Sequence, residues 1–255
     1  MAKERVDILL VERGLAPSRA RARAYILAGK VYSAEQRIEK AGHQLAADRP
    51  LEVRGPDHAY VSRGGLKLEG ALDTFRFDPL AMVAADFGAS TGGFTDCLLQ
   101  RGAKKVYAID VGYGQLHNRL RQDERVVSLE RTNARHLVDG DLPEAVDLVV
   151  IDASFIGLGK LLPAAHRLLK KEGVVIALVK PQFEAGKARL GKGGVVRDED
   201  VRRSIIAEVV EQAKRCGFAV GGLADAKIKG PKGNHEALLM LKRVDLGAEV
   251  SAESI

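Results

Sequence analysis

The stretch Met82-Val-Ala-Ala-Asp-Phe-Gly-Ala-Ser-Thr-Gly-Gly-Phe-Thr95 decides the fold class of this chain. Its first half is a nearly continuous apolar run, which is typical of a parallel strand buried on both faces. Glycines at positions 88, 92 and 93 follow, and glycine lets the backbone turn tightly and lets a ligand come close. A buried strand that leads into such a turn predicts a ligand site at the carboxyl end of the strand.

Strand-like and helix-like segments alternate from this stretch onward. Strands are predicted at Met82–Phe87, Val106–Ile109, Val126–Leu129, Asp147–Ile151, Val174–Val179, Phe218–Leu223 and Glu236–Lys242. Helices are predicted at Phe94–Gln100, Gly159–Lys170 and Asp198–Cys216. Asp198 is suited to cap the start of the last helix, and Gly217 to cap its end. The alternation predicts an α/β fold with a doubly wound, mostly parallel, Rossmann-like sheet.

The glycine-rich turn alone is compatible with more than one ligand. No Gly-Lys-Ser or Gly-Lys-Thr follows it, which excludes a P-loop, and its spacing differs from the Gly-x-Gly-x-x-Gly of dinucleotide sites. Asp110 ends the next predicted strand, where a carboxylate can accept hydrogen bonds from both hydroxyls of a ribose. The pattern therefore indicates an adenosine-containing ligand, either S-adenosylmethionine or a nicotinamide dinucleotide.

The positive charge of the chain is concentrated near its N-terminus. The formal net charge is +6, from 40 Lys+Arg and 34 Asp+Glu. Residues 1–63 hold 12 basic and 8 acidic side chains, which leaves 28 basic and 26 acidic side chains for residues 64–255. A small basic module in front of a nearly neutral body indicates a polyanionic partner, although an ordinary solvated surface has the same composition.

Composition also narrows the class of protein. No run of about 18 apolar residues occurs, which argues against a membrane-spanning helix, and the first residues lack the apolar core of a signal peptide. The two cysteines, Cys97 and Cys216, form no Cys-x-x-Cys pair and no metal-ligand cluster. We therefore expect a cytoplasmic protein with reduced thiols and no metal site, and nothing in the sequence requires more than a monomer.

The basic module is predicted to be small and α+β. Helical spacing of apolar residues predicts helices at residues 5–14 and 18–29, with Ser18 as the cap of the second, and Val31-Tyr32 and Leu51–Val53 look like short strands. Residues 4–60 resemble the S-four type RNA-binding domain, on the segments Arg5-Val-Asp7, Gly14-Leu15, Ser18-Arg19, Gly29-Lys-Val31 and Lys40-Ala-Gly42. Ser33-Ala-Glu-Gln36 departs from the Asn-Gly-like turn of that family. The resemblance implies an RNA-backbone surface formed by Arg5, Arg19, Arg23 and Lys40.

The remainder resembles the TlyA family of hemolysin-named rRNA 2′-O-methyltransferases. The resemblance rests on Tyr60-Val-Ser-Arg-Gly-Gly-Leu-Lys67, Asp86–Thr95, Ile109-Asp-Val-Gly-Tyr-Gly-Gln-Leu116, Asp152-Ala-Ser-Phe155 and Val179-Lys-Pro-Gln-Phe-Glu184. It implies an S-adenosylmethionine-dependent class I methyltransferase domain at residues 61–245, preceded by the RNA-binding domain at residues 1–60 and followed by a flexible tail at residues 246–255. It further implies ribose methylation of cytidine in rRNA, with 30S or 50S ribosomal subunits, or both, as the substrate.

FtsJ-like methyltransferases use a Lys-Asp-Lys-Glu tetrad, which falls on Lys67, Asp152, Lys180 and Glu236 by resemblance. A ribose hydroxyl is a poor nucleophile at neutral pH, so its methylation needs a base. A lysine is a base only as the neutral amine, which desolvation or a neighbouring cation favours. We expect Lys180 to be the base and Lys67 to be the neighbouring cation. Asp152 and Glu236 are expected to orient the two lysines.

The cofactor contacts are expected to follow from the same resemblance. The turn residues Gly88, Ser90, Thr91, Gly92 and Gly93 are expected to hold the methionine end of S-adenosylmethionine. Asp110 is expected to bind the ribose, and Asn133 is expected to contact the adenine edge or simply to belong to a turn.

Two other functions remain open at this point. The first is a non-catalytic RNA-binding or ribosome-assembly protein, against which the intact tetrad and glycine turn argue. The second is a membrane-acting hemolysin, against which the lack of a spanning segment and of a basic amphipathic helix argues.

Overall fold

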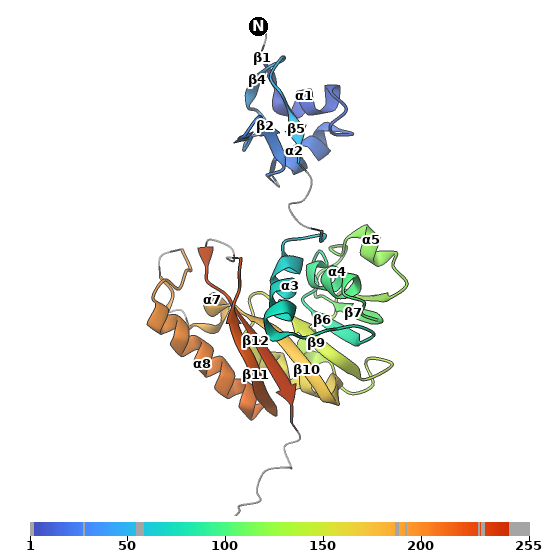
Figure 1. Cartoon of the computed structure of the whole chain (residues 1–255), viewed down its shortest axis with the longest axis vertical. Coiled ribbons are helices and arrows are strands. Elements are labelled where there is room, and N and C mark those ends of the chain that lie inside the picture. The colour runs from blue at the N-terminus through green and yellow to red at the C-terminus, as the bar shows by residue number, and fades with distance from the viewer. Residues whose placement is uncertain are drawn as a thin grey trace, which may run out of the picture. The chain divides into compact units, whose positions relative to one another are not determined.

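A computed structural model describes residues 3–27, 29–54, 59–186, 189–191, 193–228, 230 and 233–244. The chain divides into two compact units, Met1–Ala59 and Tyr60–Ile255 (Figure 1). The expected flexible tail at 246–255 lies outside the described residues.

The first unit is a small α+β module. Its helices are α1 (Val6–Glu12) and α2 (Arg19–Leu27), and its strands are β1 (Lys3–Arg5), β2 (Val31–Ser33), β3 (Gln36–Arg37), β4 (Gln44–Ala46) and β5 (Glu52–Val53). The first helix starts one residue later than predicted because Arg5 pairs with Gln44 in the β1–β4 ladder. Ser18 caps α2, since its Oγ accepts a hydrogen bond from the Arg21 amide.

The Ser33–Gln36 departure is a tight turn between two paired strands. Ser33 lies opposite Gln36 across the antiparallel β2–β3 pair, and Ala34 has a positive φ of 52°. An alanine thus takes the left-handed conformation that an asparagine or glycine adopts more readily. The apolar faces of the two helices close over a core that includes Val6, Leu10, Ala22, Ile26 and Val31.

The second unit is built on a seven-stranded sheet with the order β11-β12-β10-β9-β6-β7-β8. The five strands from β10 to β8 run parallel, and β12 is antiparallel to both of its neighbours. The mostly parallel sheet predicted from the sequence is therefore confirmed. The strands are β6 (Val83–Phe87), β7 (Lys105–Ile109), β8 (Val126–Leu129), β9 (Val146–Ile151), β10 (Leu169–Val179), β11 (Phe218–Asp225) and β12 (Ala237–Arg243).

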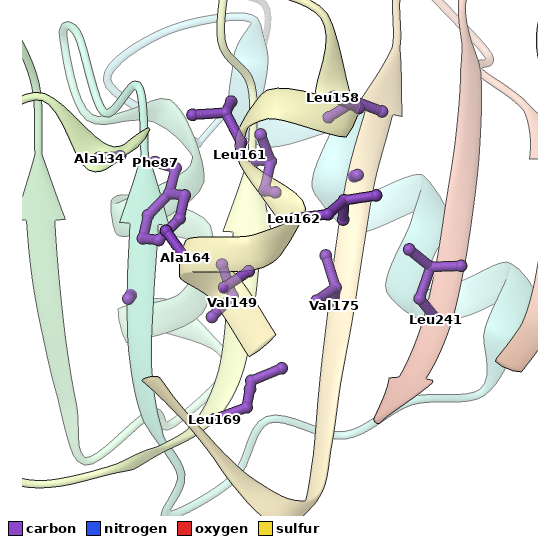
Figure 2. Close-up of a cluster of buried hydrophobic side chains, with 14 of the residues drawn as sticks. Phe87, Ala134, Val149, Leu158, Leu161, Leu162, Ala164, Leu169, Val175 and Leu241 are labelled. Carbon is purple, nitrogen blue, oxygen red and sulfur yellow. The ribbon is translucent and has the colours of Figure 1, made fainter. Parts of the chain in front are cut away.

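Helices cover both faces of this sheet. They are α3 (Gly64–Phe75), α4 (Gly93–Gln100), α5 (Asn118–Arg121), α6 (Leu162–Leu168), α7 (Pro181–Glu184) and α8 (Glu199–Arg215), with 3-10 turns at Ala134–His136 and Leu158–Lys160. The central strands alternate between two cores because successive side chains of a strand point to opposite faces. Val149 packs with Leu162 of α6 on one face (Figure 2), and Leu148 packs with Leu68 and Leu98 on the other.

Two element predictions needed correction. The helix predicted at 159–170 is interrupted after a 3-10 turn at Lys160, and it ends at Leu168 because Leu169 already begins β10. Helix α3, which precedes the first strand of the sheet and carries Lys67, was not predicted. Helix α8 begins and ends as expected, with the Asp198 carboxylate accepting from two backbone amides and Gly217 at a φ of 83°.

Candidate active site

The tetrad residues meet at one edge of the second unit's sheet. Asp152 directly follows β9, Lys180 directly follows β10, and Glu236 directly precedes β12. Because β12 is antiparallel to β10, with Ala237 opposite Val179, its start lies at the same edge as the carboxyl end of β10. Lys67 reaches this edge from α3.

The four side chains form two ion pairs. Lys67 Nζ lies 2.6 Å from Glu236 Oε2, and Lys180 Nζ lies 2.6 Å from Asp152 Oδ1. Glu236 is completely buried, while Lys67 and Lys180 keep about a tenth of their side-chain surface exposed. Each lysine thus has one carboxylate as its ion-pair partner.

Lys180 has further polar neighbours. Its Nζ donates to Ser154 Oγ at 3.1 Å and to the Asp152 carbonyl oxygen at 3.4 Å. The amine of Lys180 is therefore held by two hydrogen-bond acceptors and by its ion pair with the Asp152 carboxylate. The segment carrying Asp152 is itself tied to the glycine turn, because the Asp152 amide donates to the Phe87 carbonyl at 3.1 Å.

Three adjoining cavities meet at Asp152 and Ser154, which line all of them. The first, about 490 Å³, also contains Lys67, Lys180 and the turn residues Gly88, Ser90, Thr91 and Gly93. The second, about 510 Å³, contains all four tetrad residues together with Phe155 and Phe183. The third, about 440 Å³, contains Asp110 and Asn133. All of the predicted catalytic and cofactor residues except Gly92 thus line at least one of three cavities that share Asp152 and Ser154.

The glycine turn is shaped by backbone conformations that side chains rarely adopt. Gly88 has a φ of 84°, and a Cβ there would lie 3.1 Å from the Asp152 carbonyl oxygen and from Ala153 Cα. Gly92 has a φ of 96°, and a Cβ there would lie 2.2 Å from Leu120 Cδ1. Only glycine satisfies both the conformation and the space at these two positions.

Asp86 fixes the other side of the turn. Its Oδ2 accepts hydrogen bonds from the Thr95 amide at 3.0 Å and from the Thr95 hydroxyl at 2.7 Å, which ties β6 to the first turn of α4. Complete burial, with Asp152 as a nearby like charge, raises the pKa of Asp86 to about 7. Burial opposes ionisation because it removes water from the charged form.

The third cavity has the chemistry of an adenosine site. Asp110 accepts from the Ser90 amide at 2.8 Å and from the Gly112 amide at 2.7 Å, so the carboxylate is fixed while some of its lone pairs remain for ribose hydroxyls. Apolar walls suited to a purine come from Phe87, Ile109, Ala134, Ile156 and Leu161. Asn133 lines this cavity, but its side-chain oxygen also caps the following 3-10 turn by accepting from the Arg135 amide. Both expected roles of Asn133 are thus compatible with its position.

The sequence reasoning assigned no role to Phe155. It is 91% exposed, has a φ of 65°, and its ring centroid lies 5.0 Å from that of Phe183 beside Lys180. Large aromatic side chains are seldom left this exposed, and a positive φ is uncommon for a bulky residue. Its position shortly after β9, at the carboxyl edge of the sheet, could have marked it as a site residue. The sequence does not reveal that its side chain is exposed.

In the first unit, three of the four expected RNA-contacting residues gather around one acid. Arg5, Arg19 and Arg23 all donate to Asp7. Lys40 is exposed, and no hydrogen bond or ion pair links it to this cluster among the described residues. Within the described part of the chain, no group of His, Cys, Asp and Glu side chains is arranged to hold a metal ion, and no helix is long and apolar enough to cross a membrane.

Residues 60–243 match the family model of FtsJ-like methyltransferases, and residues 4–48 match that of the S4 domain. The chain belongs to the FtsJ-like methyltransferase family. This methyltransferase is 49% identical over 240 residues to a candidate rRNA methyltransferase of Bacillus subtilis, YqxC, covering 94% of this chain and 85% of the relative. It is 45% identical over 241 residues to the 16S/23S rRNA (cytidine-2′-O)-methyltransferase TlyA of Mycobacterium tuberculosis, covering 94% and 90% of the two chains.

Solved structures agree with this family. A hemolysin-named protein from Streptococcus thermophilus is 44% identical and superposes with a TM-score of 0.76, covering 96% of this chain and 90% of that one. The expected family, the Rossmann-like methyltransferase fold and the N-terminal S4 domain are thereby confirmed.

Proposed function

We propose that this methyltransferase transfers a methyl group from S-adenosylmethionine to a ribose 2′-oxygen of rRNA within ribosomal subunits. The observation that carries the proposal is the meeting of three cavities at Asp152 and Ser154, where the glycine turn adjoins the two lysine–carboxylate pairs. The M. tuberculosis relative, a 16S/23S rRNA (cytidine-2′-O)-methyltransferase, supports rRNA as the substrate and cytidine as the modified nucleotide. The S4 domain supports an RNA partner.

The residues present fit S-adenosylmethionine. Gly88, Ser90, Thr91 and Gly93 line the first cavity beside the lysines, and Asp110 lies in a largely apolar cavity where its carboxylate can accept from a ribose. Gly88, Ser90, Thr91, Gly92 and Gly93 would shape or line the methionine end, and Asp110 and Asn133 the adenosine end. When bound, S-adenosylmethionine supplies an electrophilic methyl group on a sulfonium centre.

Lys180 is proposed to receive the proton of the 2′-hydroxyl. In this ion pair Lys180 is an ammonium and Asp152 is a carboxylate. The ammonium must therefore lose a proton before the amine can accept the proton of the 2′-hydroxyl. The Asp152 carboxylate is the acceptor within reach, and burial of the pair under bound RNA would favour the neutral partners over the charged ones. Lys67, held by Glu236, would orient the hydroxyl and the adjoining phosphate and would oppose a second positive charge.

Phe155 is proposed as the platform for the base of the target nucleotide. A nucleotide whose ribose reaches Lys180 must be turned out of its stack, and aromatic side chains compensate for lost base stacking. Phe155 and Phe183 line the second cavity with all four tetrad residues, so an exposed ring lies beside the proposed ribose position.

The domain roles follow from this scheme. We propose that the RNA-binding domain at residues 1–60 contacts the rRNA backbone through Arg5, Arg19, Arg23 and Lys40, while the domain at residues 61–245 carries out catalysis. We further propose that the protein acts as a monomer in the cytoplasm, where ribosomal subunits are found, and that no metal ion takes part.

The test is methyl transfer from radiolabelled S-adenosylmethionine to purified 30S subunits, 50S subunits and naked rRNA, followed by nuclease digestion to identify the labelled nucleoside. We expect label in 2′-O-methylcytidine from at least one of the subunits. Label in a base rather than a ribose would overturn the proposal. Absence of label in all three substrates, with S-adenosylmethionine bound, would favour a non-catalytic assembly protein.

A further inference from the structure

Asp7 of the first unit is a completely buried acid that holds three arginines. Its carboxylate accepts from Arg5 Nε at 2.9 Å, from Arg19 Nη2 at 3.0 Å and from Arg23 Nε at 3.2 Å. Arg5 adds a second bond through Nη2 at 3.2 Å. The three guanidinium side chains remain 39%, 51% and 53% exposed, so the acid lies beneath a basic surface.

Asp7 spends most of its acceptor capacity on these contacts, three of them at Oδ2 and one at Oδ1. A carboxylate offers about four lone-pair sites, and Asp7 accepts four hydrogen bonds from the three arginines. Each guanidinium has five N–H donors, so most of the donors on the three arginines are not spent on Asp7. The cluster therefore keeps an excess of two positive charges and a set of donors at the surface.

We propose that Asp7 is the positioning residue of a phosphate-binding site made by Arg5, Arg19 and Arg23, and that this site takes a phosphodiester of RNA. The inference deepens the proposed function, on which it rests: it replaces three independent basic side chains by one built site. A planar guanidinium matches phosphate oxygens with paired donors, and several held at one point can grip a single phosphate.

The advantage of such a site is preorganisation. A free arginine side chain loses rotamer freedom when it binds, whereas one already fixed by Asp7 loses less. The Arg5 guanidinium, together with Arg19 and Arg23, holds the pKa of Asp7 far below its usual range. The acid therefore stays ionised and continues to bind the three arginines. A buried negative charge beneath an RNA-binding surface would thus strengthen RNA binding, the opposite of its simple Coulombic effect.

The experiment measures the affinity of the full chain for a fluorescein-labelled rRNA fragment. Asp7→Asn is compared with Glu12→Gln, which removes an exposed carboxylate from the end of α1 in the same unit. Asp7→Asn is expected to weaken binding about tenfold by freeing the arginines, whereas Glu12→Gln should leave it unchanged or slightly tighter. Affinity for S-adenosylmethionine should not change in either variant.

A double-mutant cycle separates positioning from misfolding. If Asp7 acts through the arginines, Asp7→Asn should cost nothing further in an Arg5→Gln/Arg19→Gln/Arg23→Gln background, in which none of the three remains to be positioned. A misfolded module would lose affinity in both backgrounds and would show altered thermal unfolding, which would overturn the inference. The inference would also be overturned if Arg19→Gln/Arg23→Gln bound RNA more weakly while Asp7→Asn bound RNA as tightly as the wild type or more tightly. In that case the proposed RNA surface would still stand. If the arginine substitutions left the affinity for RNA unchanged, both the inference and the proposed RNA surface would be overturned.

Discussion

Lys67 and Glu236 lie 169 positions apart in the chain, yet Lys67 Nζ donates to Glu236 Oε2 at 2.6 Å. The pair joins helix α3 to the start of β12, and it lines a cavity with the second pair, Lys180 and Asp152. Glu236 is completely buried, so the ion pair replaces water as the partner of its charge. The arrangement presents two lysines, each held by a carboxylate, to the same cavity.

Glu236→Gln should therefore impair catalysis without removing either lysine. We expect methyl transfer to fall about a hundredfold, because a side chain misplaced by about 1 Å can cost that much, while affinity for S-adenosylmethionine is kept. The matched control is Glu144→Gln, which breaks an ion pair with Lys105 that is more than a third exposed on both sides. Equal rates for the two variants would contradict the orienting role of Glu236.

Gly92→Ala should weaken cofactor binding. The substitution meets a strained φ of 96°, and its Cβ would lie 2.2 Å from Leu120 Cδ1 and 2.8 Å from Leu116 Cδ1, so either the turn or these two leucines must shift. We expect at least a tenfold loss of affinity for S-adenosylmethionine, or about 1.4 kcal/mol, measured by calorimetry. Gly140→Ala is the control, because its φ is 93° but nothing lies within 4 Å of the added Cβ. Equal losses in both variants would mean that backbone strain alone, and not the cradle, explains the effect.

Phe155→Ala should act on the RNA substrate. Loss of a base-stacking platform costs about 1–3 kcal/mol, so we expect kcat/KM for rRNA to fall about tenfold or more. Phe155→Tyr should keep most of the activity. Leu80→Ala removes another exposed apolar side chain, 65% exposed and ahead of β6, and should have no effect. If Phe155→Ala lowered only the affinity for S-adenosylmethionine, the platform would be refuted, and Phe155 would act through the third cavity, which it also lines.

Asp86 gives the second unit a pH dependence. Its pKa is raised to about 7 by burial, above the value near 4 of an unfolded chain, so the folded state holds the proton more tightly. The associated stability is present at low pH and is lost as the pH rises through about 7, by up to about 1.4 kcal/mol per pH unit. Asp86→Asn can keep the Thr95 hydrogen bonds without an ionisable group. Its thermal stability relative to the wild type should therefore increase between about pH 4 and about pH 7, and a constant difference would contradict this account.

The sequence predicted the second unit's sheet because its strands carry their own signal. The runs ending at Ile151 and Val179 are apolar without interruption, and the run ending at Phe87 is broken only by Asp86, as expected for strands buried on both faces. Helix α3 carried a weaker signal, with glycines at 64, 65 and 70 that lower helix propensity. It forms because Leu68 and Leu72 bury themselves against the sheet, a tertiary effect that local propensity does not contain.

The candidate site was predictable in membership but not in geometry. Resemblance to FtsJ-like methyltransferases indicated Lys67, Asp152, Lys180 and Glu236. Their pairing, however, depends on the packing of α3 and on the register that places Val179 opposite Ala237. Phe155 escaped because a single aromatic residue in a sequence gives no sign of exposure. Asp7 escaped because only folding brings Arg5, Arg19 and Arg23 onto one carboxylate.

The central claim, that Lys180 handles the proton of the 2′-hydroxyl, is tested most directly by single-turnover methyl transfer with Lys180→Met. A control lies on the same two strands: Lys170 at the start of β10 pairs with Asp147 at 2.7 Å, at the end of the sheet away from the site. The account predicts that Lys180→Met lowers the rate by about a hundredfold or more while the affinities for S-adenosylmethionine and rRNA are kept, and that Lys170→Met changes none of them. A near wild-type rate for Lys180→Met would contradict it.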